Sequence, residues 1–305
     1  MSTLYTEQSK NVRNTWFLMT MFLVVIVALG YFISYYYSSP VILYGAIIFS
    51  LLMNILSYWY SDKIVLTMAG AKEADHDTYT DLYHTVENLS LTAGLPMPRV
   101  YLIKDGSPNA FATGRDKEHA VVAVTTGLLQ ILNKTELEGV IAHELSHIGN
   151  RDILLQTVIV VLVGFVSILA NIFMRGGMRR GDRDNDKGGG ILMVAGIVLV
   201  ILSPLFAKLI QLAISRKREF LADASGVLLT RYPEGLASAL QKISQANIPL
   251  RNPNQATAHL FIANPFPQVN LGQVSNLGNK FSSLFSTHPP VTERIKAILG
   301  ERKVE

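Results

Sequence analysis

Two histidines and the glutamate between them have the spacing of a zinc-binding motif. Residues 141–147 read IAHELSH, so His143, Glu144 and His147 form the pattern H-E-x-x-H. Residues four positions apart lie on one face of a helix, which lets both imidazoles bind one metal ion. Glu144 is placed to accept a proton from an attacking water. The chain has only seven histidines, which argues against a chance match, so the pattern predicts a hydrolytic metal site.

The third ligand is expected from a more distant segment. A hydrolytic zinc site has three protein ligands and one open position, and no third histidine follows closely after His147. The segment Arg218–Asp223 reads REFLAD and places Glu219 one helical turn before Asp223. We interpret Glu219 as the third ligand and Asp223 as the acceptor of a hydrogen bond from a ligating imidazole. The expected cofactor is therefore one Zn²⁺ per chain.

The residues around the motif predict the helix that it requires. Thr135 is followed three residues later by Glu138, the pattern of a capping box at a helix start. Apolar residues then recur with a helical period, and Gly149 is the expected end of the helix.

Further elements predict an α/β domain around this helix. The expected helices are Thr80–Leu91, a segment through Glu219, Pro233–Ala246 and a last helix opened by Pro289 and Pro290, and the expected strands are Arg99–Lys104 and Ala120–Thr125.

Composition predicts a membrane protein. Hydrophobic residues make up 49% of the chain and charged residues 16%, against roughly 25% charged residues in an average soluble domain. The mean hydropathy is +0.29. The chain has no cysteine, which excludes disulfides, cysteine metal ligands and a thiol nucleophile. The net charge is +4 and no basic run with interleaved aromatic residues occurs, so we expect no nucleic-acid partner.

The first two of four long apolar stretches predict a membrane hairpin. They cover about residues 16–37 and 41–60 and approach the roughly 20 residues that a helix needs to cross a bilayer. Residues 38–40 alone separate them, which predicts a tight turn. Lys10 and Arg13 precede the first stretch and favour a cytoplasmic N-terminus. No small-residue cleavage pattern follows, so we interpret the stretch as a retained anchor and not as a cleaved signal peptide.

The other two apolar stretches leave their membrane path open. They cover about residues 153–174 and 191–214, and the linker 175–190 contains five basic and three acidic residues. If both stretches span the membrane, this basic linker lies outside, which the excess of Lys and Arg in cytoplasmic loops disfavours. A re-entrant or protein-buried hairpin is the alternative.

The predicted fold is α+β and mostly helical, an integral membrane protein with a zinc-protease domain and four hydrophobic helices. Residues 1–60 are expected to form the N-terminal membrane hairpin. Residues 61–152 form the first part of the catalytic domain with the motif helix, residues 153–214 the second apolar pair with its polar linker, and residues 215–305 the second part of the catalytic domain.

Several motifs in this order resemble the HtpX family of membrane zinc metallopeptidases, relatives of the eukaryotic CAAX prenyl proteases. Besides the hairpin, they are Asn109–Thr113 (NAFAT), H-E-x-x-H with Asn150 and Asp152 behind it, Glu219-x-x-x-Asp223 and Thr287–Pro290 (THPP). The resemblance implies a gluzincin-like domain on the cytoplasmic side of a multi-pass protein in the inner membrane. It also implies proteolytic quality control of membrane proteins, often under stress.

The resemblance suggests roles for further residues. Asn109, Ala110, Phe111 and Ala112 resemble the edge strand on which an extended substrate would lie through main-chain hydrogen bonds. His288 resembles the residue that supports the oxyanion, and Asn150 and Asp152 are expected to support the ligand helix. The remaining histidines have no partner at ligand spacing and are interpreted as surface residues. They are His76, His84, His119 and His259.

The expected partners are protein or peptide substrates, membrane proteins in particular, and the lipid bilayer. The sequence leaves two alternatives to membrane-protein proteolysis. One is processing of CAAX-type substrates, which the chain's fewer hydrophobic segments disfavour. The other is a non-catalytic membrane scaffold, which the complete set of catalytic groups disfavours.

Overall fold

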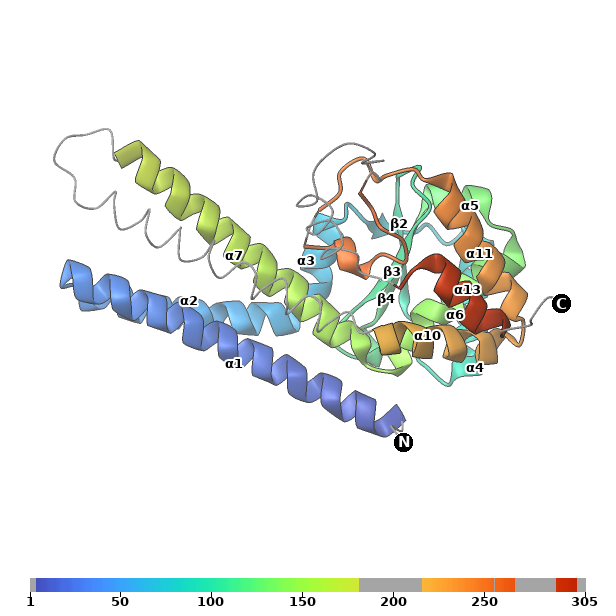
Figure 1. Cartoon of the computed structure of the whole chain (residues 1–305), viewed down its shortest axis with the longest axis horizontal. Helices are drawn as coiled ribbons and strands as arrows, with labels where there is room; N and C mark the ends of the chain where they lie inside the picture. Colours follow the sequence, from blue (N-terminus) through green and yellow to red (C-terminus); the bar gives the residue numbers. More distant parts are fainter. Residues whose placement is uncertain (1–3, 181–215, 255, 267–288, 301–305) are drawn as a thin grey trace.

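The structure consists of long apolar helices on one side and an α/β domain on the other (Figure 1). It is a computed structural model that describes residues 4–180, 216–254, 256–266 and 289–300. The expected fourth apolar stretch, residues 191–214, and His288 lie outside the described residues. Helices dominate the described chain and a small mixed sheet completes it, which confirms the predicted α+β class.

The first two helices form the expected hairpin. Helix α1 (Leu4–Tyr37) and helix α2 (Pro40–Trp59) are joined by a tight turn in which Ser38 has a φ of 51°. Pro40 is the first residue of α2, where a missing N–H costs nothing. Helix α7 (Asp152–Arg180) packs against α1 and α2. Apolar side chains of α1, including Leu18 and Phe22, form one cluster with Leu155 and other residues of α7.

Among the residues that the structure describes, two helices are long and apolar enough to cross a membrane, namely Ser9–Tyr37 and Pro40–Trp59. A third crossing is counted if helix α6 (Lys134–Gly149) and the start of α7 form one span bent by 84°. The expected third apolar stretch, residues 153–174, lies within helix α7. This helix begins at the sharp bend that directly follows the motif helix α6. Aromatic residues with large exposed fractions, such as Tyr35 and Trp59, lie toward the ends of the hairpin helices.

A four-stranded sheet forms the centre of the α/β domain. The strands are β1 (Lys72–Glu73), β2 (Arg99–Ile103), β3 (Ala110–Thr113) and β4 (Val121–Thr125), and their order in the sheet is β1-β2-β4-β3. Strands β2 and β4 are parallel, and the other pairs are antiparallel. Strand β3 therefore lies at an edge, as expected for Asn109–Thr113.

Helices cover both faces of this sheet. In β4, alternate side chains point to opposite faces: Val122 and Val124 join a core with helices α4 (Thr80–Ala93) and α6. Val121 and Ala123 face the other way, toward helix α3 (Ser61–Met68) and α7. Both strands and the helices predicted at 80–91 and 233–246 are confirmed within a few residues. The same core includes helix α11 (Pro233–Ala246), and a short helix α5 (Thr126–Ile131) precedes α6.

The start of the motif helix differs from the prediction. Helix α6 begins at Lys134 with a capping box between Asn133 and Glu136, two residues before the predicted pair Thr135 and Glu138. The Glu136 carboxylate accepts the Asn133 main-chain N–H at 2.8 Å. It is also buried and binds Ser238 and Lys242 of α11. The contacts of Glu136 with α11 therefore favour the capping box Asn133–Glu136 over the predicted pair Thr135–Glu138.

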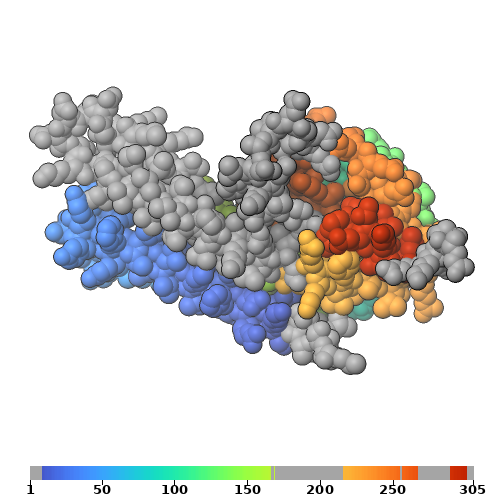
Figure 2. Space-filling model, in the orientation of Figure 1, coloured from blue at the N-terminus to red at the C-terminus, as the bar shows by residue number. Residues whose placement is uncertain are grey.

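Helix α10 (Arg216–Thr230) lies against α6 and carries the predicted third ligand. Gly226 makes the close approach possible, since a Cβ atom there would lie 3.0 Å from the main-chain nitrogen of His143. The last described helix, α13 (Val291–Leu299), follows Pro289 and Pro290 as expected and packs on α10 and α11. Figure 2 shows α10 and α13 side by side on one face of the molecule.

We expect Gly226→Leu to separate α10 from α6. The backbone of α6 cannot yield to the added side chain as a flexible side chain would, so the free energy of unfolding should fall by about 1–3 kcal/mol. Gly45→Leu is the matched control, because a Cβ atom at Gly45 has no atom within 4 Å and the residue is exposed. Unfolding in detergent measures both variants, and equal stability of the two would contradict the proposed packing.

Candidate metal centre

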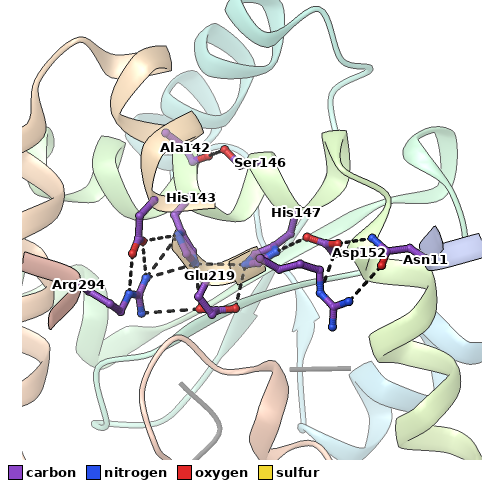
Figure 3. Close-up of polar contacts among 10 residues, drawn as sticks. Asn11, Ala142, His143, Ser146, His147, Asp152, Glu219 and Arg294 are labelled. Atoms are coloured by element: carbon purple, nitrogen blue, oxygen red, sulfur yellow. Dashed lines mark hydrogen bonds and ion pairs between the residues drawn. The ribbon is translucent and has the colours of Figure 1, made fainter. Parts of the chain in front are cut away.

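The three predicted ligands converge in the structure. His143 and His147 lie on α6 and Glu219 on α10, and one ligand atom of each lies within 4.8 Å of the others. The Nε2 atoms of the two imidazoles are 3.2 Å apart. A Glu219 carboxylate oxygen lies 3.9 Å from Nε2 of His143 and the other oxygen 3.6 Å from Nε2 of His147. Figure 3 shows the three side chains pointing toward one another.

These separations fit a zinc ion. Bond lengths of about 2.0–2.2 Å in a tetrahedral site place neighbouring ligand atoms about 3.3–3.5 Å apart. The distances between the three side chains, 3.2 to 3.9 Å, surround this range. Two histidines and one carboxylate are also a ligand set that hydrolytic zinc sites use, with one position left for water.

Two carboxylates fix the orientation of the imidazoles. Oδ1 of Asp223 lies 2.9 Å from Nδ1 of His143, and Oδ2 of Asp152 lies 3.0 Å from Nδ1 of His147. A neutral imidazole that donates its Nδ1–H to a carboxylate presents the lone pair of Nε2 to a metal. The expected partner role of Asp223 fits this geometry. Asp152 holds the second imidazole directly, which is more than the general support of the helix predicted for it.

The side chains around the ligands carry an excess of negative charge. With both imidazoles neutral, the described part of the site sets four buried carboxylates against two buried guanidinium groups, which leaves two negative charges. Buried charges are costly unless they are paired. A divalent cation bound by the three ligands would balance the excess. The groups in this count are Glu144, Asp152, Glu219, Asp223, Arg218 and Arg294.

Arg294 is a charged member of this site that the sequence analysis does not predict. It lies on α13 with a relative exposure of 0%. Its Nε and Nη2 atoms donate to the two oxygens of Asp223 at 2.9 and 2.6 Å, and Nη1 lies 3.9 Å from Glu219. The sequence holds one signal for it, because Arg294 occupies the same helical face as the apolar residues Val291 and Ile298. An arginine within an apolar stripe indicates a buried partner.

The charges of the Asp223–Arg294 pair reinforce each other. Burial tends to raise the pKa of Asp223, but hydrogen bonds from Arg294 and His143 outweigh burial and lower this pKa to about 2. Burial tends to lower the pKa of Arg294, yet the hydrogen bond to Asp223 and the nearby carboxylates raise it above its ordinary value. Both groups are therefore charged near neutral pH, and the Asp223 carboxylate accepts a hydrogen bond from the Nδ1–H of His143.

The other residues that the sequence singles out differ in burial and in their distance from the ligands. Glu144 is 2% exposed and lies beside the ligands on α6. Asn150 is buried at the C-cap of α6, where its main-chain N–H binds the Ser146 carbonyl. His288 lies outside the described residues. The prediction that His259 is a surface residue is wrong, because its side chain is 2% exposed and packs near the Gln156 carbonyl. The other three histidines, His76, His84 and His119, are exposed as predicted.

Part of the free edge of β3 is hydrogen-bonded to another segment of the chain, residues 262–263. The Asn109 side chain is buried and exchanges two hydrogen bonds with the main chain of Ala263, at 3.0 and 3.1 Å. The Ala110 carbonyl accepts the N–H of Ile262 at 3.0 Å. A substrate role of residues 109–112 stays a prediction, and the Asn109 side chain itself ties two chain segments together.

Comparison with known proteins adds family relationships to this geometry. The profile of peptidase family M48 matches residues 77–302. The Protease HtpX homolog of Caldanaerobacter subterraneus subsp. tengcongensis is 46% identical over 304 residues, covering 97% of each chain. That of Pyrococcus furiosus is 51% identical over 251 residues, covering 82% of this chain and 83% of the relative. The crystal structure of S. mikatae Ste24p is similar in fold, with a TM-score of 0.50, 17% identity and coverage of 97% of this chain and 66% of that one.

Zinc affinity should rise with pH. Burial tends to lower the pKa of His147, but the hydrogen bond to Asp152 and the charges of Glu219, Asp152 and Glu144 raise this pKa to about 9 in the metal-free protein. Below that pH a proton occupies His147 and must leave when zinc binds. The apparent zinc affinity should therefore increase up to about tenfold per pH unit between about pH 6 and about pH 8.

Competition with a chelator at several pH values measures this slope. Asp152→Asn is the control, because it removes the carboxylate that holds the proton and should flatten the profile. An affinity that is equal across the range in the wild type would contradict the assignment of His147 as a ligand.

Proposed function

The chain belongs to peptidase family M48 and is a metalloprotease, and we propose that it is an HtpX-type zinc endopeptidase. The substrates that we propose are misfolded or damaged membrane proteins, which it cleaves at the cytoplasmic face of the membrane. The observation that carries the zinc assignment is the convergence of His143, His147 and Glu219 from two helices. Zinc held by these residues would supply a Lewis acid for the scissile carbonyl and a water of lowered pKa.

Glu144 moves the proton in the proposed reaction. It directly follows the ligand His143 and is buried, so its carboxylate lies in the same water-poor environment as the ligands. It accepts a proton from the attacking water and returns the proton to the amine that leaves. The negative charge that develops on the carbonyl oxygen requires a donor, and we assign His288 to this role from the family resemblance. Such a donor contributes about 3 kcal/mol to catalysis in comparable sites.

Three charged residues hold the ligands in place. Asp223 and Asp152 keep the two imidazoles in one tautomer, and Arg294 fixes Asp223 through two hydrogen bonds. Because all three side chains are buried, these electrostatic interactions are stronger than they would be in water. The ligand geometry is therefore set before a substrate arrives.

We assign substrate binding to the free edge of strand β3 and to the cavity near its N-terminal end. Thr125 donates its N–H to the Asn109 carbonyl, and in an antiparallel pair alternate residues then direct their main-chain groups outward. Ala112 is one of these outward residues, and an extended substrate could pair there. A cavity of about 390 Å³ adjoins this edge and is bordered by Ile243, Ile262 and Arg294. Its walls combine apolar residues such as Ile243 with polar residues such as Ser244 and Asn247, which suits a substrate segment of mixed polarity.

The apolar hairpin supports the proposed location and substrate class. The two or three possible membrane helices of the described chain would hold the protease at the bilayer, where exposed segments of membrane proteins are within its reach. Lys10 and Arg13 at the N-terminal end of the first apolar helix favour the cytoplasmic side for the N-terminus and, after two crossings, for the α/β domain. Peptide segments exposed by misfolded membrane proteins on that side are the proposed substrates.

Replacing Glu144 with Gln should abolish hydrolysis and leave zinc bound. Glutamine keeps the size of the side chain but cannot accept the proton, so the cleavage rate should fall by about 10²–10⁴-fold. Glu138→Gln, the same change on an outward position of α6, is the matched control and should retain activity. Zinc content and cleavage are measured together, and full activity of the Glu144→Gln variant would refute the proposed mechanism.

The same preparation tests the substrate class. Full-length protein is placed in vesicles with one membrane protein in its folded form or in a destabilised variant. We expect selective cleavage of the destabilised variant. Equal cleavage of both forms would refute the quality-control proposal, and cleavage of prenylated C-terminal peptides alone would support CAAX-type processing instead.

The absence of cysteine allows a direct test of orientation. Single cysteines are introduced at Glu118, an exposed residue of the α/β domain, and at Ser38, in the turn between α1 and α2. A thiol reagent that cannot cross the membrane should label Ser38→Cys in intact cells and Glu118→Cys only after permeabilisation. The reverse pattern would place the active site outside the cytoplasm.

A further inference from the structure

A polar side chain of the first membrane helix lies within the support of the metal site. Asn11 of α1 is 1% exposed. Its Nδ2 donates to Oδ1 of Asp152 at 2.5 Å, and its Oδ1 accepts from Nη1 of Arg218 at 3.1 Å. Figure 3 shows Asn11 at one end of a row of contacts that passes through Asp152 and His147 to Glu219. The hairpin is thus connected to the ligands by hydrogen bonds, not only by the chain.

Asn11 contacts both elements that carry ligand support. Asp152 is the first residue of α7 and holds His147 through its other carboxylate oxygen, at 3.0 Å. Arg218 lies on α10 directly before the ligand Glu219. The guanidinium Nε of Arg218 lies 3.7 Å from Asp152, so the Asn11 amide completes the polar contact between these two opposite charges.

The contact lies at the bend between α6 and α7. The geometry of this bend determines the orientation of Asp152, the first residue of α7. The two helices meet at 84° and Arg151, between them, has a φ of 57°. The Asn11 amide also lies 3.5 Å from the Asn150 carbonyl at the end of α6. A side chain that binds both sides of a bent junction restricts the rotation of Asp152, and through Asp152 the rotation of the His147 ring.

We propose that Asn11 is a positioning residue of the metal site. Through Asn11, the N-terminal hairpin of α1 and α2 affects the zinc affinity of the α/β domain. This inference rests on the zinc site proposed above. Asn11 acts on His147 through Asp152 and on the α10 end of the site through Arg218. The membrane hairpin is then part of the metal centre's support in addition to being an anchor.

Zinc affinity of the full-length protein in detergent tests this role. We expect Asn11→Leu to weaken zinc binding about tenfold, at the lower end of the effect of losing a polar partner of a metal ligand. Asn54→Leu is the matched control, since Asn54 lies in the same hairpin and donates to the Met19 carbonyl of α1 at 3.2 Å. It should change the affinity less than about twofold, because none of the contacts described for Asn54 leads to a ligand.

Coupling to Asp152 separates positioning from packing. If Asn11 acts through Asp152, Asn11→Leu should add less than about a twofold loss in an Asp152→Asn background, because the two changes remove one pathway. An equal loss with and without Asp152, or an unchanged affinity of Asn11→Leu, would overturn the proposal. The visible spectrum of cobalt-substituted protein is a second readout, and it should change in Asn11→Leu but not in Asn54→Leu.

Two further measurements keep the test decisive. Asn11→Ala replaces Asn11→Leu if the larger side chain prevents purification of folded protein, since truncation removes the amide without adding bulk. The wild type distinguishes this inference from the proposed function. A wild type that binds no zinc would refute the proposed function and this inference with it, whereas a wild type and an Asn11→Leu variant of equal affinity would refute this inference alone.

Discussion

An excess of buried negative charge is the constraint on which the catalytic half of this protein depends. Four carboxylates and two guanidinium groups surround two imidazoles whose Nε2 atoms face each other at 3.2 Å. Such a group of side chains is stable only if every charge has a partner, because burial removes the solvation that water would give. The arginines, the imidazole tautomers and the ligand geometry all follow from this need, and a divalent cation completes the balance.

The packing of the helices serves this charge balance. The α6–α10 contact brings Glu219 to the histidines, and Gly226 allows the two backbones to approach. α13 brings Arg294 to Asp223, and α7 brings Asp152 to His147. The sheet holds α6 from its other side. The site is thus assembled from segments that are distant in sequence, and each contributes one charged group that the others need.

Sequence alone could predict the parts of the site that depend on local spacing. The motif histidines are four positions apart on one helix, and Glu219 and Asp223 repeat that spacing, so a helical period was enough to find them. Arg294 and Asn11 were missed because their roles depend on partners 71 and 141 positions away. The capping residue was wrong by two positions, and His259 was wrongly placed on the surface, because tertiary contacts of Glu136 and Gln156 decide both cases.

The order of these segments along the chain has a consequence for biosynthesis. His143 and His147 are synthesised before Glu219, and Arg294 follows its partner Asp223 by 71 positions. A ribosome-bound chain that has inserted its hairpin and folded its sheet therefore still has no complete ligand set. The three-ligand set is complete only when Glu219, 72 positions after His147, has been synthesised and α10 has packed on α6.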